Sequence, residues 1–324
     1  MNIAIMGAGA VTKAFMGLLE SPNSTGVQDL KVKYVFNSKG GVYDEAGIGK
    51  FKNISEHKAY TPGLSIKDVK PNEVDVVVDL KSTDLASAEK DFDVCAQILK
   101  DGMSLVSGNK GPVVYGYKRL KNLAQASGVH FLCSCACAAA LPSVIVGIDA
   151  HAGSKIHSFE GIVNGTTNYI ISKMEAGISY DAALKAAQDE GIAEKNPAND
   201  VEGTDTVIKT VMLANIIWDT EVSVESATVT GIDRLTGDDI QRAAREGKKI
   251  KLIGRATLNG SGTPQITVAP EAIGPEHLLY ATSGKYKTIV FSSNNMGNVM
   301  ISGSSSLKGA AAAVLRDIVG GVRI

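Results

Sequence analysis

Carboxylates and a lysine gather in one short stretch of the chain, from Gly191 to Lys209. The acidic side chains of this stretch are Glu194, Asp200, Glu202 and Asp205. A proline and a glycine interrupt it, and apolar residues at helical spacing predict a helix from Thr204. Asp205 and Lys209 stand four residues apart, so they share one face of that helix. The arrangement suits binding of an ammonium group or proton transfer by the lysine. A solvated loop followed by a surface ion pair is the competing interpretation.

The N-terminus has the local order strand, glycine turn, helix, which is typical of dinucleotide-binding folds. Apolar residues Ile3–Ile5 predict the strand, and G-A-G-A-V-T follows at positions 7–12. Gly7 permits a tight turn, and Gly9 lets main-chain amides approach a pyrophosphate at the helix N-terminus. Thr12 stands where the third glycine of the G-x-G-x-x-G motif belongs, so the match is partial. The predicted cofactor contacts in this turn are Gly7, Gly9, Ala10 and Val11.

The second predicted strand, Lys31–Phe36, leads into Asn37. An acidic residue at this strand end binds the ribose of NAD in many such folds, and none is present here. Asn37 can still donate to a ribose hydroxyl, and Lys39 can pair with the 2′-phosphate of NADP. A solvent-exposed turn is the alternative, so the sequence leaves the choice between NAD and NADP open.

Two later strands, predicted at Val74–Leu80 and Met103–Ser107, also end in polar residues. Because ligands of open parallel sheets bind at the carboxyl ends of the strands, we expect further cofactor contacts there. The residues concerned are Ser82, Thr83, Ser107 and Lys110. The next helix is predicted over Tyr117–Ser127, which leaves Lys110 in a loop at the rim of the sheet.

Three of the four cysteines, Cys133, Cys135 and Cys137, occupy alternate positions in a predicted strand over Val129–Cys137. On a strand their side chains point to one face. Three thiols can ligate a soft metal, but no fourth ligand stands nearby and the spacing is not that of a C-x-x-C loop. Small buried residues are the favoured interpretation, and we predict no metal site with thiol ligands.

Length and composition indicate a two-domain α/β protein. The chain has 324 residues, 44% of them hydrophobic, and a net charge of −1, which gives no reason to expect nucleic acid or an anionic membrane as a partner. No signal peptide is recognisable and no apolar run could span a bilayer, so we predict a cytoplasmic protein. We expect a dinucleotide-binding domain over residues 1–135, a second domain over 136–303, and a helix in 304–324 that packs back on the first.

Several motifs resemble those of homoserine dehydrogenases, and the resemblance covers nearly the whole chain. They are G-A-G-A-V, V-S-G-N-K, G-I-V-N-G-T-T-N-Y-I and A-E-x-x-P-x-x-D-V-E-G-x-D-x-x-x-K. The resemblance implies a Rossmann-like domain joined to an α+β catalytic domain with a mixed sheet, and a homodimer formed through the second domain. It also implies NAD(P)-dependent interconversion of L-homoserine and L-aspartate 4-semialdehyde, a step in threonine and methionine biosynthesis.

By motif position, the resemblance makes Lys110 and Lys209 the catalytic lysines. It assigns substrate binding to the residues Glu194, Asp200, Asp205, Gly165 and Thr166. The chemistry agrees, because hydride delivery to an aldehyde leaves an alkoxide that a lysine ammonium can protonate.

The chain departs from the family around residue 134. The family carries a glutamate there that helps to bind a monovalent cation, and this chain has Ser134. Alanines, Ala138 and Ala140, replace glycines that normally follow. The main-chain carbonyls of Cys137, Ala139 and Leu141 remain as candidate cation ligands.

The chain also ends soon after its last predicted helix. We therefore expect a short form without a C-terminal regulatory domain, and activity that threonine does not control allosterically. Two other interpretations stay open on the sequence: a related NAD(P)-dependent oxidoreductase acting on another small amino or oxo acid, and a catalytically silent nucleotide-binding protein.

Overall fold

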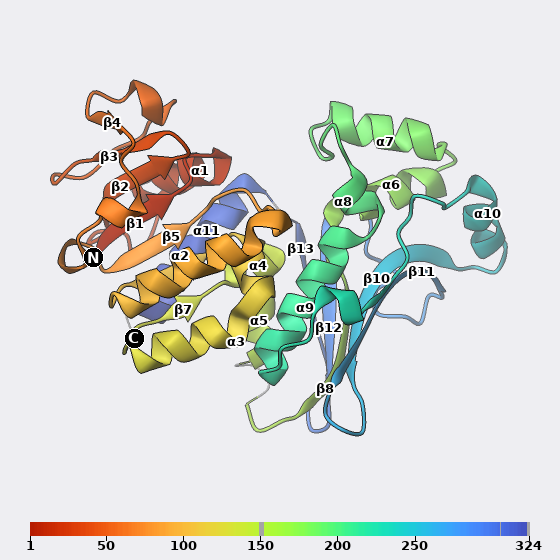
Figure 1. Ribbon diagram of the computed structural model, residues 1–324. Coiled ribbons are helices and arrows are strands. Elements are labelled where there is room, and N and C mark those ends of the chain that lie inside the picture. Colours follow the sequence, from red (N-terminus) through yellow and green to blue (C-terminus); the bar gives the residue numbers. More distant parts are fainter. Residues whose placement is uncertain (149–151, 305, 323–324) are drawn as a thin grey trace. The chain divides into compact units, whose positions relative to one another are not determined.

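The computed structural model describes residues 1–148, 152–304 and 306–322, and the chain divides into two compact units. The first unit comprises Met1–Ala140 together with the C-terminal segment from Ser306, and the second is the chain between them. Figure 1 shows the elements of both. Within the described ranges, no helix is long and apolar enough to cross a membrane.

The first unit is built on a seven-stranded sheet with the strand order β4-β3-β2-β1-β5-β6-β7. Its strands are β1 (Asn2–Met6), β2 (Lys31–Asn37), β3 (Gly40–Tyr43), β4 (Tyr60–Pro62), β5 (Val76–Asp79), β6 (Ser104–Ser107) and β7 (Phe131–Leu132). The five strands from β2 to β7 in this order run parallel, and β3 and β4 add an antiparallel edge. The order reverses at β1, which is where open α/β sheets bind their ligands. The Rossmann-like prediction is confirmed.

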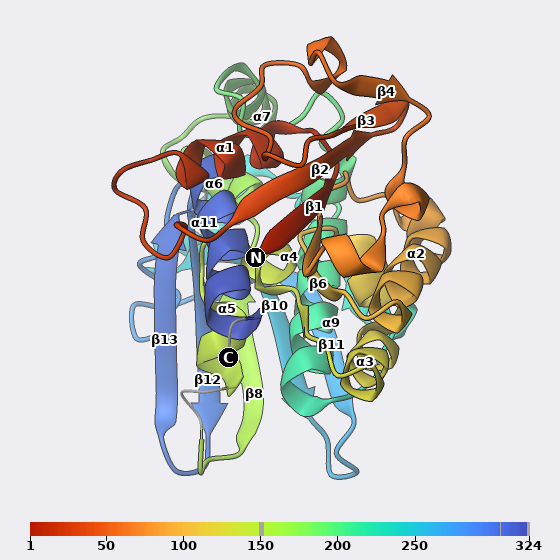
Figure 2. The ribbon, with the colours of Figure 1, turned by 90° about the vertical axis from the view of Figure 1, so that its left-hand side faces the viewer.

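Helices cover both faces of this sheet. Helices α2 (Ala88–Lys100) and α3 (Lys110–Ala126) lie on one face, and α1 (Ala10–Leu19) and α11 (Leu307–Asp317) on the other. The side chains of β1 alternate accordingly, because Ala4 packs with Leu99 of α2 whereas Ile3 packs with Phe15 of α1. Burial on both faces explains why β5 is a continuous apolar run. Figure 2 shows α11, from the far end of the sequence, alongside α1.

The second unit contains a six-stranded sheet in the order β13-β12-β8-β10-β11-β9. Its strands are β8 (Ile156–Ile162), β9 (Thr228–Val229), β10 (Lys249–Leu258), β11 (Pro264–Ile273), β12 (Tyr286–Ser293) and β13 (Gly297–Ser304). The pairs are antiparallel except that β9 runs parallel to β11, so the sheet is mixed as predicted.

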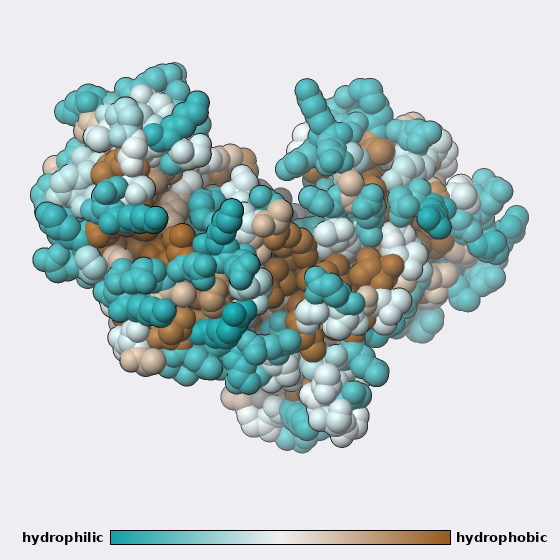
Figure 3. Space-filling view, viewed as in Figure 1, coloured by the Kyte–Doolittle hydropathy of each residue, from teal (hydrophilic) through white to brown (hydrophobic). Residues whose placement is uncertain are grey.

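The helices of the second unit pack on this sheet or on one another. They are α5 (Ser143–Ile148), α6 (Gly165–Glu175), α7 (Tyr180–Asp189), α8 (Ala198–Val201), α9 (Thr204–Trp218) and α10 (Gly237–Arg245). Helices α6, α9 and α10 pack on β10, and α7 packs on α6. The outer surfaces of α7 and α10 are mainly hydrophilic in Figure 3, which agrees with the few residues that each buries.

Helix α9 is the central helix of the second unit. Most of its residues are buried, Asp205 among them, which is typical of a helix enclosed by other elements rather than lying on a surface. Gly203 precedes it with a φ of 86°, a conformation that favours glycine. Strand β10 approaches α9 so closely at Gly254 that a Cβ there would lie 2.3 Å from Thr210 Oγ1. The glycine therefore sets the distance between α9 and the sheet.

The strand predicted through the three cysteines was wrong. Strand β7 ends at Leu132, Cys133 is the N-cap residue, and α4 (Ser134–Ala138) follows. The main-chain N–H of Ser134 donates to the Asp317 carboxylate of α11 at 2.9 Å, and a carboxylate at a helix N-terminus stabilises the helix. This partner lies far along the sequence, so local alternation of residues could not reveal it. Cys133 and Cys137 consequently lie one helical turn apart.

Helix α3 begins at Lys110, earlier than the predicted start at Tyr117. Asn109 caps it by accepting the Gly111 N–H at 3.1 Å, and Pro112 is tolerated because the first turn has no intrahelical partner for its missing N–H. The helix is kinked at Gly116, which separates the missed first turns from the predicted part. The sequence analysis also missed the short elements β3, β4, β9, α4 and α8, and helix α10.

We expect Gly254→Ala to destabilise the second unit by about 1–3 kcal/mol, the usual cost of overpacking. The added methyl group would contact Thr210 and force α9 away from β10. Urea unfolding followed by the fluorescence of Trp218, the single tryptophan and the last residue of α9, measures the effect. Gly237→Ala in the exposed first turn of α10, where a Cβ meets no atom within 4 Å, is the control. An unchanged midpoint for Gly254→Ala would contradict the close approach.

Candidate active site

The acidic loop and the start of α9 form a largely buried ion pair. Lys209 Nζ lies 2.5 Å from Asp205 Oδ2, and the two side chains are 13% and 12% exposed. Lys209 also donates to the main-chain oxygen of Val163 at 3.3 Å. The interpretation of this pair as an ordinary surface ion pair is therefore excluded. Both groups have lost most of their hydration, and such a pair persists only where further hydrogen bonds support it.

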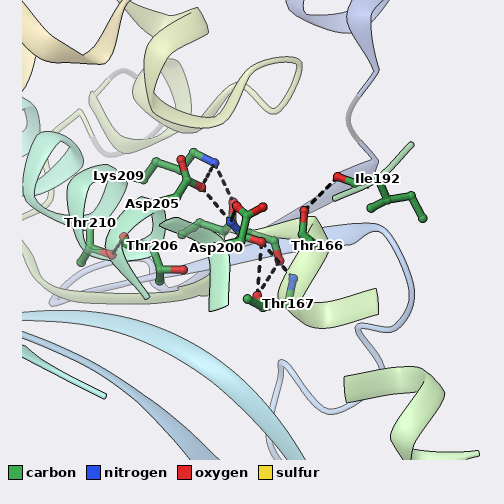
Figure 4. A network of polar contacts seen from close by, with 10 residues as sticks. Thr166, Thr167, Ile192, Asp200, Asp205, Thr206, Lys209 and Thr210 are labelled. Atoms are coloured by element: carbon green, nitrogen blue, oxygen red, sulfur yellow. Dashed lines mark hydrogen bonds and ion pairs between the residues drawn. The ribbon is translucent and has the colours of Figure 1, made fainter. Parts of the chain in front are cut away.

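Asn164 supplies that support. Its Nδ2 donates to Asp200 Oδ1 at 2.6 Å and to Asp205 Oδ2 at 2.9 Å. Its Oδ1 accepts the Thr167 N–H at 3.0 Å and so caps α6. Figure 4 shows Lys209 bound to Asp205, with the carboxylate of Asp200 close to this pair. Asn164 stands within the G-I-V-N-G-T-T-N-Y-I motif, but no role was predicted for it. An asparagine directly before a G-T-T helix start was the available signal.

Asp200 differs from Asp205 in its electrostatic situation. Burial raises the pKa of the Asp200 carboxyl, the nearby negative charge of Asp205 adds to the increase, and the hydrogen bond from Asn164 opposes it. Asp205 has the Lys209 ammonium as its direct partner, whereas Asp200 shares only the Asn164 amide with that pair. A carboxylate held this way is disposed to accept a positively charged partner, because a cation would stabilise its ionised form.

The other predicted substrate residues divide into two groups. Thr166 is buried, and its hydroxyl donates to the main-chain oxygen of Ile192 at 3.2 Å. Gly165 is the first residue of α6, where an added Cβ would lie 3.1 Å from the Lys285 oxygen. Both lie in the first turn of α6, directly after Asn164, which binds the two carboxylates. Glu194 is exposed and lies outside this hydrogen-bonded group.

The glycine turn of the first unit has the shape that a dinucleotide requires. Gly7 has a φ of 99°, and a Cβ there would lie 2.6 Å from the Leu80 oxygen, so only glycine fits. Gly9 is the N-cap residue of α1, and a Cβ there would meet no atom within 4 Å. The space beside Gly9 leaves room for a ligand against the first amides of α1, those of Ala10 and Val11.

Thr12 explains the partial match to the glycine motif. Its side chain is fully buried, and its hydroxyl donates to the Gly7 main-chain oxygen at 2.5 Å. A threonine at this position fixes the turn from inside the unit, so the missing third glycine does not open it.

Asn37 lies in a hairpin between β2 and β3. Its Oδ1 accepts the N–H groups of Lys39 and Gly40 at 2.8 and 3.0 Å, and its Nδ2 donates to Ser55. The side chain that was predicted to meet a ribose is thus engaged in the turn. Lys39 is exposed beside it.

The remaining predicted cofactor residues lie around the start of α3. Ser82 is exposed and Thr83 half-buried, whereas Ser107 is fully buried and donates to the Asn109 oxygen at 2.9 Å. The hydroxyl of Ser107 thus supports the turn, and its burial does not favour a contact with a cofactor. The Lys110 N–H donates to Thr83 Oγ1 at 3.1 Å. Lys110 belongs to the first unit and Lys209 to the second.

Charged side chains of α11 bind polar groups of the segment around α4. Ser134 carries no charge, and its N–H is taken by Asp317. The Arg316 guanidinium donates to the Ala140 oxygen at 3.5 Å. A positive charge therefore already lies beside this carbonyl, and it would repel a cation bound next to it. Ala139 has a φ of 55°, a strained conformation for alanine. Cys137 and Ala139 lie in the first unit and Leu141 in the second.

Two of the three thiols of this segment, those of Cys133 and Cys137, are buried, and Cys135 is partly exposed. Cys133 and Cys137 share a hydrogen bond that, with burial, raises the pKa of the Cys133 thiol. Across residues 1–148, 152–304 and 306–322, no group of three or more His, Cys, Asp or Glu side chains is placed to hold a metal ion.

The fold and the site define a class of protein: a nucleotide-dependent oxidoreductase with a Rossmann-type domain and a second unit that carries a buried carboxylate–lysine group. Sequence comparison gives the family. The profile described as homoserine dehydrogenase matches residues 144–319, and the homoserine dehydrogenase NAD binding domain profile matches residues 7–134. The chain belongs to the homoserine dehydrogenase family.

Individual relatives agree with this assignment. The chain is 32% identical to the NAD(+)-dependent homoserine dehydrogenase of Pseudomonas canavaninivorans, over 98% of this chain and 95% of the relative. It resembles a crystal structure from Archaeoglobus fulgidus with a TM-score of 0.87 and 28% identity, covering 99% of each chain. It also resembles a homoserine dehydrogenase from Thiobacillus denitrificans with a TM-score of 0.84 and 25% identity, covering 100% of this chain and 73% of the other.

The two aspartates should respond oppositely to neutralisation. Burial raises the pKa of Asp200 above its unfolded value, so the folded state binds a proton more readily and ionisation at pH 7 costs stability. Asp200→Asn should therefore raise the melting temperature at pH 7, and the gain should fade as the pH falls and Asp200 takes up its proton. Asp205→Asn should instead cost about 3–5 kcal/mol, because it leaves a buried lysine unpaired. Calorimetry at pH 7 and pH 4.5 compares them, and equal losses in both variants would refute the distinction.

We expect no saturable activation by Na⁺ or K⁺, because Arg316 and Asp317 already occupy polar groups of the segment around α4. The measurement is an initial-rate series in each chloride salt, with a bulky organic cation at equal ionic strength as the control. Saturable activation by one alkali ion alone would show that main-chain carbonyls suffice to bind it.

Proposed function

We propose that the chain interconverts L-homoserine and L-aspartate 4-semialdehyde, with Lys209 and Lys110 as its catalytic lysines. The observation that carries the assignment is the buried pair of Lys209 and Asp205, held by Asn164 beside a second carboxylate. A substrate amino acid carries an ammonium group, and Asp200 is the carboxylate disposed to receive it. Glu194 is exposed and outside this hydrogen-bonded group. We assign it a secondary role in substrate binding.

Lys209 acts on the substrate oxygen. Its ammonium donates a proton as the aldehyde oxygen becomes a hydroxyl, and it recovers the proton from solvent or from a neighbouring group. Asp205 fixes the amine by an ion pair within the same helix, so Lys209 loses little mobility on binding substrate. In the reverse direction the deprotonated lysine removes the proton of the homoserine hydroxyl.

The first unit holds the cofactor. Gly7, Gly9 and the first amides of α1 bind the pyrophosphate, for which the open space beside Gly9 is suited. When bound, NAD(P)H supplies the hydride. The hydroxyl of Thr83 accepts the main-chain N–H of Lys110. The ammonium of Lys110 is the second catalytic group of this proposal. The exposed ammonium of Lys39, beside the β2–β3 hairpin, is the group that we assign to a 2′-phosphate. Its position supports use of NADP as well as NAD.

A homodimer formed through the second unit is part of this proposal. Tyr286, Met300 and Leu278 are exposed apolar side chains of the second unit, at 55%, 50% and 44%. They line a cavity of about 260 Å³ together with Thr288 and Ser302. Exposed apolar groups that gather in this way favour an interface between subunits. A cytoplasmic location fits the four cysteines, all of which are free thiols.

Replacing Lys209 by alanine should lower kcat by roughly 10²–10⁴, the range for loss of a general acid. The assay is NAD(P)H oxidation with aspartate 4-semialdehyde, run beside other small aldehydes to test substrate choice. Lys185→Ala is the matched control, because Lys185 pairs with Asp189 at the same i,i+4 spacing but is 69% exposed. Near-normal kcat in Lys209→Ala, or equal rates with unrelated aldehydes, would overturn the proposal.

A further inference from the structure

A buried polar network lies beneath the start of α3, and the proposed chemistry does not use it directly. Asp79, at the end of β5, and Asn109, before α3, are both fully buried. Asn109 Nδ2 donates to Asp79 Oδ2 at 3.2 Å and to Asp91 Oδ2 of α2 at 2.9 Å. The remaining oxygen of Asp79 accepts the Lys81 N–H at 3.1 Å. Both oxygens of the Asp79 carboxylate are therefore engaged as acceptors.

The same network controls the main chain around Lys110. The Asp79 main-chain oxygen accepts the Gly108 N–H at 2.8 Å, and its side chain binds Asn109. Asn109 in turn caps Gly111, and the N–H of Lys110 is held by Thr83. Residues on both sides of Lys110 are thus fixed to the end of β5 and to α2. The network therefore fixes the main chain from which the Lys110 side chain extends.

We propose that Asp79, acting through Asn109, is a positioning residue that sets the geometry of Lys110 and gives the reaction an acid limit. This inference rests on the proposed role of Lys110. A carboxylate is needed because an amide at position 79 has a single oxygen. An asparagine there could accept from Lys81 or from Asn109, but it would present an N–H group to the other. The ionised carboxylate alone satisfies both donors.

The charge of Asp79 depends on pH in the mildly acidic range. Burial raises the pKa of its carboxyl to about 6, against the opposing effect of Lys81. The groups that face it are Lys81 from the following loop, Asp91 and the Cys95 thiol from α2, and the neutral residues Asn109 and Ser107. On the β1 side its neighbour is the apolar Met6. As the pH falls through about 6, protonation weakens Asp79 as an acceptor, and its hydrogen bond from Asn109 weakens with it.

The chain contains a second arrangement of the same kind. Asn164 caps α6 and donates to two aspartates, one of which holds Lys209. Asn109 caps α3 and donates to two aspartates, and Lys110 follows it directly. In both units a capping asparagine joins two carboxylates beside a lysine. The parallel supports a role for the first network in placing its lysine.

The test is the pH profile of kcat for the whole enzyme and for Asp79→Asn. The wild-type profile should fall on the acid side with an apparent pKa near 6. Asp79→Asn should lower kcat at pH 7.5 by about 10- to 100-fold, as expected for a misplaced catalytic group, with smaller changes in KM. Its profile should be flat across pH 6, because the titrating group is gone. An unchanged kcat and an unchanged acid limb would overturn the inference.

Asn109→Ser provides a second route if Asp79→Asn folds poorly. Serine can still cap α3 but cannot join two carboxylates, so kcat should fall by a similar factor. The double variant should be no worse than either single one, because both changes break the same connection. Additive losses would contradict the connection.

Two further variants separate the possible failures. Asp317→Asn alters another buried carboxylate of the first unit. The kcat profile of this variant should keep its acid limb. Lys110→Met tests the proposed function: if it keeps normal kcat, Lys110 has no catalytic role. If Lys110→Met is inactive while Asp79→Asn keeps the wild-type profile, only the positioning role is refuted.

Discussion

The central constraint on the second unit is the largely buried ammonium group of Lys209. Lys209 stands on a helix that is buried on most of its surface, and its ammonium is stable there because Asp205 lies one turn earlier. Asp205 in turn shares Asn164 with Asp200. An isolated buried charge would cost several kcal/mol, so the acidic loop, the cap of α6 and the first turn of α9 must fold together.

Close packing of the backbone makes this possible. The approach of β10 to α9 at Gly254 and the left-handed turn at Gly203 place the start of α9 against the sheet and beside the acidic loop. The aspartate and the lysine then point toward α6 instead of solvent. Side chains fixed by packing lose little freedom when a substrate binds, which favours catalysis.

The first unit is also held together by residues from distant regions of the sequence. Helix α11 returns from the C-terminus to cover the sheet beside α1, and its Asp317 caps α4. The Arg316 guanidinium next to it binds the oxygen of Ala140. Opposite charges from one helix thus hold the two ends of the segment that leads out of the unit.

The sequence by itself determined the features that depend on local order. Spacing of apolar residues gave the parallel strands and α9, and the positions of glycines gave the turn before α1 and the start of α9, because backbone preferences act between neighbours. The motifs around Lys110 and Lys209 also indicated the family. The tertiary structure decided what depends on distant partners. The segment predicted as a strand through the cysteines is a helix whose first N–H binds Asp317. The Asn37 side chain binds main-chain groups of its own hairpin, and Glu194 is exposed. The tertiary structure also joined Asn164 to two aspartates that lie 36 and 41 residues away, and hydrogen bonds over such separations leave no periodic trace in a sequence.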